Sequence, residues 1–405
     1  MNPPQQIRSQ PLRNAGPGKR CRNALFLLAA SATGWLPIQA QFQSGSNGSY
    51  GPLVVTAADT TLDLPPDGVF HCTTIEVPAG RRLRFNRNAL NTPVVLLATG
   101  DVTIAGEVIV SGARGSSLAG GQGGPGGFDG GAPGSAGLPA GDGLGPGGGK
   151  AGIFLGGADG PGAASFGAQP VFSPESRRGA IYGSPLLLPV VGGSGGGGAS
   201  GSPGWGGGGG GGALLIASAT RIQLTGILWA VGGAGYNSSV PNSGSGGGVR
   251  LVAPWMGGTG RIEVGGYGGD GNRGDGRVRI DALDRTQLGI SIVPSAAGSV
   301  GGVLVVAPSP LPRLDVIEAA GRTIPVDSGP VNVVLPTGTP PAQTVRIRAR
   351  DFGQTVAIRV VLTPDSGPGV AYDTQVDNTA ANPAEVSVPV VFPVNVLTHV
   401  QVWTR

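Results

Sequence analysis

The chain has 405 residues, of which 12% are charged and 5% aromatic, and it contains 79 Gly and 36 Pro. This length predicts two or three domains. Many of the Gly and Pro residues separate short runs rich in Val, Ile and Leu, which disfavours simple disorder. Helix-period stretches are missing after residue 40, so the sequence predicts an all-β protein with many turns.

Residues 1–40 have the order of a secretory signal peptide. Basic residues precede the apolar run "ALFLLAASATGWLPI" (24–38), and Ala40 offers a small residue at a cleavage point. A membrane anchor is the alternative, but the run is shorter than the roughly 20 residues of a spanning helix and contains Gly34 and Pro37. We therefore expect a secreted or cell-surface protein with no stable membrane span after cleavage.

Removing this segment changes the charge balance. It holds five of the 27 basic residues and no acidic residue, which leaves 22 basic against 23 acidic residues. No cluster of Arg or Lys forms a track for phosphate groups, so we expect no nucleic-acid partner. Cys72 is the single cysteine after residue 40, which excludes an intrachain disulfide and a Cys-based zinc site. It is predicted to be a buried apolar side chain on a strand.

After a polar leader at 41–51, short strand-like runs follow one another with period-two alternation. Three segments resemble one another: "VLLATGDVTIAGEVIVSGARG" (95–115), "LLIASATRIQLTGILWAVGGAG" (214–235) and "VRLVAPWMGGTGRIEVGGYGG" (249–269). Repetition at about 20 residues predicts stacked rungs that bury a continuous interior, as in a parallel β-helix. The predicted core consists of the apolar positions of these segments: Val102, Ile104, Val108, Leu215, Ile222, Leu224, Val249 and Leu251.

Three phrases carry a resemblance to a known group: "FNRNALNTPVVLLATGDVTIAG" (85–106), "SGGGVRLVAP" (245–254) and "GGDGNRGDGRVRIDA" (268–282). The chain resembles the uncharacterised glycine-rich, secreted β-helical proteins of bacteria, a group similar in architecture to pectin-lyase-like right-handed solenoids. The likeness covers roughly residues 55–285. It implies a solenoid fold over 52–306, and because the group carries no established chemistry it implies no activity.

Glycine dominates the insertions at about 115–212 of the predicted solenoid, and the second tract ends in seven glycines at 206–212. Three interpretations are open: disordered loops, loops with sparse turns, or bundled extended helices with three residues per turn, akin to polyproline II. In the last, residues without a Cβ allow close backbone packing. The following strand, "ALLIA" (213–217), is predicted to be buried by the solenoid interior on one face and by the glycine-rich insertion on the other.

A proline-rich linker at 307–313 marks a change in composition, and glycine is ordinary beyond it. Seven strand-like runs fill 314–405, including "VNVVLP" (331–336) and "HVQVWTR" (399–405). Seven short strands in this length predict a small immunoglobulin-like β-sandwich with His399 on its last strand. The expected architecture is therefore a parallel β-helix with glycine-rich insertions, followed by a β-sandwich.

The stretch "GGDGNRGDGRVRID" (268–281) gathers the candidate acid–base groups Asp270, Arg273, Asp275, Arg277 and Asp281. The favoured interpretation is structural, with the acidic residues in turns while Arg277 and Arg279 face solvent. Asp270 and Asp275 are also calcium candidates, because "GGYGGDGN" (265–272) matches half of a calcium-binding nonapeptide. No tandem copy follows, and no catalytic motif is present, so we predict no catalytic residue, no metal and no cofactor.

The sequence thus favours a non-enzymatic secreted or cell-surface protein of structural or adhesion type, whose solenoid displays glycine-rich loops. The alternative is a carbohydrate-binding or carbohydrate-active β-helix protein, which rests on fold analogy. A patterned-surface role such as ice binding is disfavoured because regular Thr ladders are not apparent. The expected partner is a polysaccharide or a cell-surface component, and four aromatic residues could stack on sugar rings: Trp205, Trp229, Trp255 and Tyr267.

Overall fold

The computed structural model describes residues 42–135, 137–153, 159–237, 242–267, 274–307 and 311–405. The predicted signal peptide therefore lies outside the described residues, as do Asp270, Arg273 and part of the predicted linker. The described residues are almost entirely strands, turns and extended segments, with one short 3-10 helix, η2 (Ser295–Ala297). Within these ranges, no helix has the length and apolar character needed to cross a membrane.

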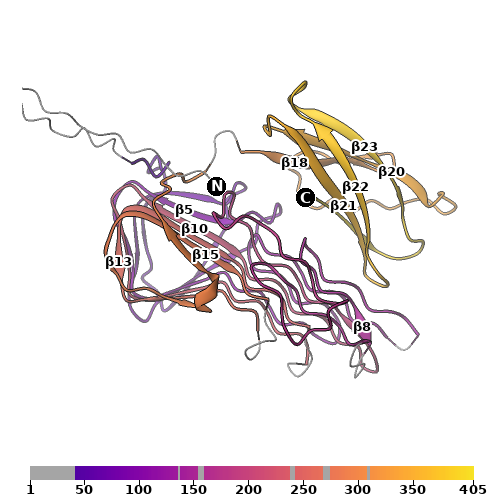
Figure 1. The fold of residues 1–405 in the computed structure, drawn as a ribbon, viewed down its shortest axis with the longest axis horizontal. Helices are drawn as coiled ribbons and strands as arrows, with labels where there is room; N and C mark the ends of the chain where they lie inside the picture. The colour runs from indigo at the N-terminus through magenta and orange to yellow at the C-terminus, as the bar shows by residue number, and fades with distance from the viewer. Residues whose placement is uncertain (1–41, 136, 154–158, 238–241, 268–273, 308–310) are drawn as a thin grey trace, which may run out of the picture. The chain divides into compact units, whose positions relative to one another are not determined.

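The first two thirds of the described chain forms parallel sheets (Figure 1). The larger sheet has the strand order β10-β5-β3-β6-β11-β13-β15-β17, with β1 paired to β3, and the pairing of β10 with β13 closes six strands into a parallel barrel. The smaller sheet has the order β16-β14-β12-β7-β4-β2. The strands are β1 (Gly51–Val54), β2 (Asp59–Asp63), β3 (Val69–Val77), β4 (Arg82–Asn86), β5 (Val94–Ala98), β6 (Val102–Ile104), β7 (Glu107–Ile109), β10 (Ala213–Ser218), β11 (Arg221–Leu224), β12 (Ile227–Trp229), β13 (Gly248–Gly258), β14 (Arg261–Glu263), β15 (Arg277–Leu288), β16 (Ser291–Val293) and β17 (Gly298–Gly301).

The three similar segments of the sequence pair with one another in parallel. β5, β6 and β7 pair in register with β10, β11 and β12, and these pair with β13 and β14. Because side chains alternate between the faces of a strand, pairing in register gathers the apolar positions into one interior. All eight predicted core residues are buried, with Leu215 the most exposed of them at 4%. Cys72 is buried in the same interior, as expected.

The outer face of β10 is also buried, and its cover includes part of the glycine-rich insertion, as predicted, together with other segments. Leu214 and Ile216 point into the main core. Leu215 and its outward neighbours pack instead with Val190, Leu304 and other apolar side chains. Val190 belongs to the insertion, and apolar side chains from the chain before β1 and after β17 add to this cover. The residues in this second cluster are Phe42, Val69, Val95, Leu97, Val190, Ala213, Leu215, Ala217, Val252, Leu304 and Val306.

The glycine tracts are ordered and hydrogen-bonded, which favours the third of the three interpretations. The seven glycines at 206–212, called here the central glycine segment, donate their amides in steps of three. Gly206, Gly209 and Gly212 donate to carbonyls of 110–116, Gly207 and Gly210 to carbonyls of 128–131, and Gly208 and Gly211 to Asn242 and Ser245, at distances of 2.6–3.0 Å. A partner that recurs every third residue is the signature of an extended helix with three residues per turn.

The carbonyls of the central glycine segment also change partner with a period of three, and their partners are three further stretches of backbone. They accept amides from 121–124, 193–196 and 233–236, again in steps of three. The segment therefore lies among six neighbouring stretches of backbone, and each of its seven residues both donates and accepts a hydrogen bond. Figure 1 shows these stretches running beside one another and turning back near β8 (Gly152–Ile153), which pairs with β9 (Ala199–Ser200). We call this bundle of hydrogen-bonded stretches between 110 and 248 the glycine array.

Residues 313–405 form two antiparallel sheets, with strand orders β19-β18-β20-β23 and β22-β21-β24. Buried side chains of both sheets share one apolar cluster that includes Ile347 of β20 and Ile358 of β21. The strands are β18 (Arg313–Ala319), β19 (Arg322–Thr323), β20 (Ala342–Arg350), β21 (Thr355–Pro364), β22 (Val370–Asp377), β23 (Ala384–Val391) and β24 (Thr398–Thr404).

Six of the seven predicted runs are strands, and His399 lies on β24 as expected. The prediction of a strand at 331–336 was wrong, because no strand is formed there. Pro330 and Pro336 remove amide donors at both ends of the run, and Val334 is 84% exposed, so its valines find no sheet to pack against.

Candidate functional site

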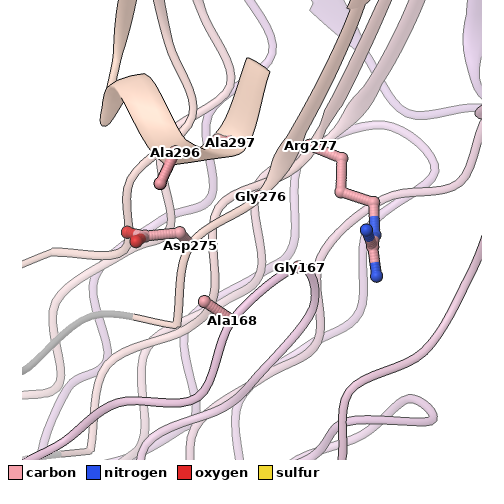
Figure 2. Close-up of a pocket in the computed structure, with 7 residues that line it drawn as sticks. All are labelled: Gly167, Ala168, Asp275, Gly276, Arg277, Ala296 and Ala297. Carbon is pink, nitrogen blue, oxygen red and sulfur yellow. The ribbon is translucent and has the colours of Figure 1, made fainter. Parts of the chain in front are cut away.

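Of the proposed acid–base set, Asp275, Arg277 and Asp281 lie within the described residues, whereas Asp270 and Arg273 lie outside them. Asp275 lines a cavity of about 60 Å³ together with Arg277, Ala296 and four other small or backbone groups. Figure 2 shows the Asp275 carboxylate and the Arg277 side chain pointing in different directions from Gly276. The cavity has room for a water molecule or two and no organic substrate. It is lined by Gly167, Ala168, Asp275, Gly276, Arg277, Ala296 and Ala297.

Arg277 does not face solvent, contrary to the interpretation of the sequence. Its guanidinium lies 5.6 Å from the ring centre of Phe166, and Nη2 donates to the Tyr182 carbonyl at 3.2 Å. Burial lowers the pKa of Arg277, and the same burial raises the pKa of the Tyr182 hydroxyl, which contacts Ser194. These groups tie β15 to the glycine array.

Asp281 has a structural role in β15. It is fully buried and accepts hydrogen bonds from Arg250 at 3.2 Å and from Arg279 at 2.7 Å. Burial alone would raise the pKa of Asp281, but hydrogen bonds from Arg279, the Val303 amide and Arg250 lower it below its ordinary value. Arg279 is correspondingly held by Asp281 and only 12% exposed, instead of facing solvent.

No further acidic side chains join Asp275 to form a calcium site in the described part of the chain. Asp270 lies outside it, and across the described ranges no three His, Cys, Asp or Glu side chains converge into a metal-binding group. The two histidines are likewise apart: His71 lies on β3, and His399 on β24 contacts Asp365 at 3.1 Å. That hydrogen bond raises the pKa of His399.

The four aromatic candidates lie at separate places. Trp205 is buried in the glycine array, with its ring centre 6.4 Å from that of Tyr236. Tyr267 is 49% exposed just after β14. Trp255 of β13 covers Gly257, where a Cβ would meet the indole at 2.5 Å. Trp229 is half-buried on β12 of the smaller parallel sheet.

Among the four aromatic candidates, Trp229 lies on a sheet surface whose neighbouring side chains are given by strand register. Leu228 is fully buried, so period-two alternation turns Trp229 and Ile227 to the outer face of the smaller sheet. Register places Ile109 of β7 and Glu263 of β14 directly beside Trp229. We call the outward side chains of β4, β7, β12 and β14 the Trp229 face: Arg82, Arg84, Glu107, Ile109, Ile227, Trp229, Arg261 and Glu263.

Hydrogen bonds fix the orientation of this face. The Trp229 indole Nε1 donates to Glu107 Oε2 at 3.1 Å, so the ring is directed along the sheet toward β7. Glu107 also contacts Arg82 at 3.5 Å, and Arg261 forms an ion pair with Glu263. In the part of the chain that the structure describes, Arg84 forms no ion pair, and it is exposed two strands from Trp229.

Sequence reasoning found Trp229 but missed its charged neighbours. Glu107 and Trp229 are separated by more than 100 residues, and their contact follows only from the register of β7 on β12. The similarity of the segments 95–115 and 214–235 was the available signal, since aligning them as paired strands brings these positions together. Comparisons with protein-family models, with curated proteins and with solved structures gave no match.

Proposed function

We propose that this chain is a secreted or cell-surface, non-enzymatic binding protein of structural or adhesion type. In this proposal the parallel strands are successive coils of a β-solenoid, and residues 314–405 are an immunoglobulin-like sandwich. The observation that carries the proposal is the central glycine segment with its six hydrogen-bonded neighbours. A bundle of this kind holds its connecting turns at fixed positions, which suits display of a binding surface.

The turns at one end of the glycine array support this role. The stretch 199–206 contacts 116–119, 137–140 and Tyr236: Gly206 donates to Ser116, Tyr236 donates to Gly206, and Ala140 donates to the Ser200 hydroxyl at 2.8 Å. Two large apolar side chains at this end are exposed to solvent, Leu118 at 90% and Leu138 at 60%. Exposed apolar side chains gathered on ordered turns are typical of a contact surface for a partner.

The test is adhesion of the purified full chain to a panel of cell surfaces and polysaccharide extracts. We expect the double variant Leu118→Ser, Leu138→Ser to lose most of the binding. The matched control is Leu283→Ser on β15, which removes an apolar side chain that is 67% exposed away from these turns, and it should bind normally. Equal binding by both variants, or release of cleaved sugar from any polysaccharide, would overturn the proposal.

A second candidate function, carbohydrate binding, is favoured by the Trp229 face. An indole held along an open sheet by a carboxylate offers an apolar platform, and the charged groups around it are hydrogen-bond partners for hydroxyls. This candidate does not require catalysis, and it is compatible with an adhesion role.

A further inference from the structure

We propose that the Trp229 face binds an uncharged polysaccharide along the outer surface of the smaller parallel sheet. This inference deepens the proposed binding role by naming a ligand class and a site, and it rests on that role. It does not depend on the turns of the glycine array, which lie on other residues. The argument uses the orientation of Trp229, the charge balance of the face and its open form.

The first step concerns the platform. The Trp229 indole is anchored through Nε1 to Glu107, and Ile109 and Ile227 lie beside it as partly exposed aliphatic neighbours. An anchored ring loses little conformational freedom when a ligand covers it, so binding requires little further loss of side-chain entropy. The C–H groups of a pyranose ring present a flat apolar surface of the kind that packs on such a platform.

The second step concerns charge. The Trp229 face contains three guanidinium groups, from Arg82, Arg84 and Arg261, and two carboxylates, from Glu107 and Glu263. The neighbouring strand β2 adds Asp59 and Asp63 on the same side, so positive and negative groups nearly balance, and most of them already pair with one another. A balanced face offers no net attraction to a uronic-acid polymer or to a polyamine, whereas its carboxylates and guanidinium groups can each hydrogen-bond hydroxyls.

The third step concerns the size of the ligand. Glu263 is buried, so the accessible row starts at Trp229. It runs through Ile109 and Arg84 to the exposed Thr61 of β2, and it crosses four neighbouring strands. Strands lie about 4.8 Å apart, so this row extends over roughly 14 Å. Small ligands usually require a concave site that buries most of their surface, and an open row of this length suits several linked sugars instead.

The experiment is affinity electrophoresis of the full chain in gels that contain one soluble polysaccharide each: a neutral glucan, a neutral mannan, polygalacturonate or chitosan. We expect retardation by at least one neutral polymer, with little dependence on salt. Trp229→Ala should weaken that binding about tenfold or more, and Trp229→Phe should retain part of it. The matched control is Trp255→Ala, which removes an indole from the larger sheet and should leave retardation unchanged.

Each other outcome decides against the inference. Retardation by polygalacturonate or chitosan alone, abolished by salt, would identify a charged ligand and overturn it. Equal binding by Trp229→Ala and the wild-type chain would place the site elsewhere. Absence of retardation by every polymer would also overturn it, and if the chain still adhered to cells through Leu118 and Leu138 the proposed function would stand without it.

Discussion

At the scale of single residues, the seven glycines of the central segment are required by their neighbours. A Cβ at any of these positions would meet a backbone atom of another stretch at 2.5 Å or less, as at Gly208, where the Gly233 carbonyl oxygen lies 2.0 Å from the ideal Cβ position. Backbone atoms cannot move aside as a flexible side chain can. Glycine loses more backbone entropy on folding than other residues, and here the two hydrogen bonds of each residue offset that cost.

We predict that Gly208→Ala destabilises the protein by about 3 kcal/mol or more, because the methyl group must push apart two hydrogen-bonded stretches. Chemical denaturation followed by circular dichroism measures the change. The control is Gly302→Ala, since the nearest atom to a Cβ there is the Ala282 carbonyl oxygen at 3.9 Å, and its midpoint should stay within error of the wild type. A similar midpoint for Gly208→Ala would mean that the segment is not packed as described.

A second prediction concerns Asp281, the buried carboxylate between Arg250 and Arg279. Asp281→Asn leaves a buried guanidinium without its anion and should cost about 3–5 kcal/mol at pH 7. The pKa of Asp281 is lowered in the folded protein, so its stabilisation is present above the unfolded-state pKa and declines as the pH falls. At pH 3 the gap in unfolding free energy between wild type and variant should therefore be smaller than at pH 7.

Urea denaturation at the two pH values measures this gap. Asp284→Asn is the control, because Asp284 lies on the same strand with its carboxylate exposed and accepts hydrogen bonds from the Thr286 amide and hydroxyl. It should show little change at pH 7. A gap for Asp281→Asn that stayed the same at both pH values would show that the carboxylate does not carry the pH dependence.

At the scale of elements, the central glycine segment replaces a strand with a helix of three residues per turn while every one of its amides and carbonyls stays hydrogen-bonded. Each such helix makes no internal hydrogen bonds, so its order depends entirely on its neighbours. The stretch 206–212 continues directly into β10. At Ala213 the hydrogen-bonded neighbours of the chain therefore change from extended helices to parallel strands.

We predict that the amides of 206–212 exchange with deuterium as slowly as those of β10, because both groups are buried and bonded. Peptide-resolved hydrogen exchange followed by mass spectrometry measures the rates. The segment 331–335, which forms no strand, provides a fast-exchanging reference in the same chain. If 206–212 exchanged as fast as this reference, the tract would be a disordered loop and the prediction would be wrong.

The sequence predicted some elements and not others, for physical reasons. Alternating apolar residues such as Val102 and Ile104 identify strands because burial on one face repeats every second residue. The run at 331–336 is also rich in Val and Leu but lacks a partner strand, and an apolar run alone cannot show that. The glycine tracts left three interpretations open because a period of three says nothing about which distant stretches lie alongside.

At the scale of the whole molecule, the all-β class followed from composition, whereas the candidate surface did not. Trp229 was one of four aromatic candidates, and its place on a repeat favoured a packing role as much as a binding role. Its distinction comes from Glu107 and Arg84, which only strand register brings near it. The acidic stretch at 268–281 attracted attention because its residues are close in sequence, yet Asp281 is buried in an ion network and Asp275 lines a small cavity.

The hexagonal surroundings of the central glycine segment have an evolutionary consequence. The helix has three residues per turn and six neighbouring stretches, so each residue of a turn contacts two of them. An unbroken run of glycine is therefore expected where a helix is enclosed on all sides. Where every third residue is not glycine, that side of the helix is open to solvent. Gln122 is an example: it is exposed and lies between Gly121 and Gly123. Substitutions at the open sides and turns can accumulate without altering the bundle, so a lineage could diversify what it recognises while the glycine spacing itself stays fixed.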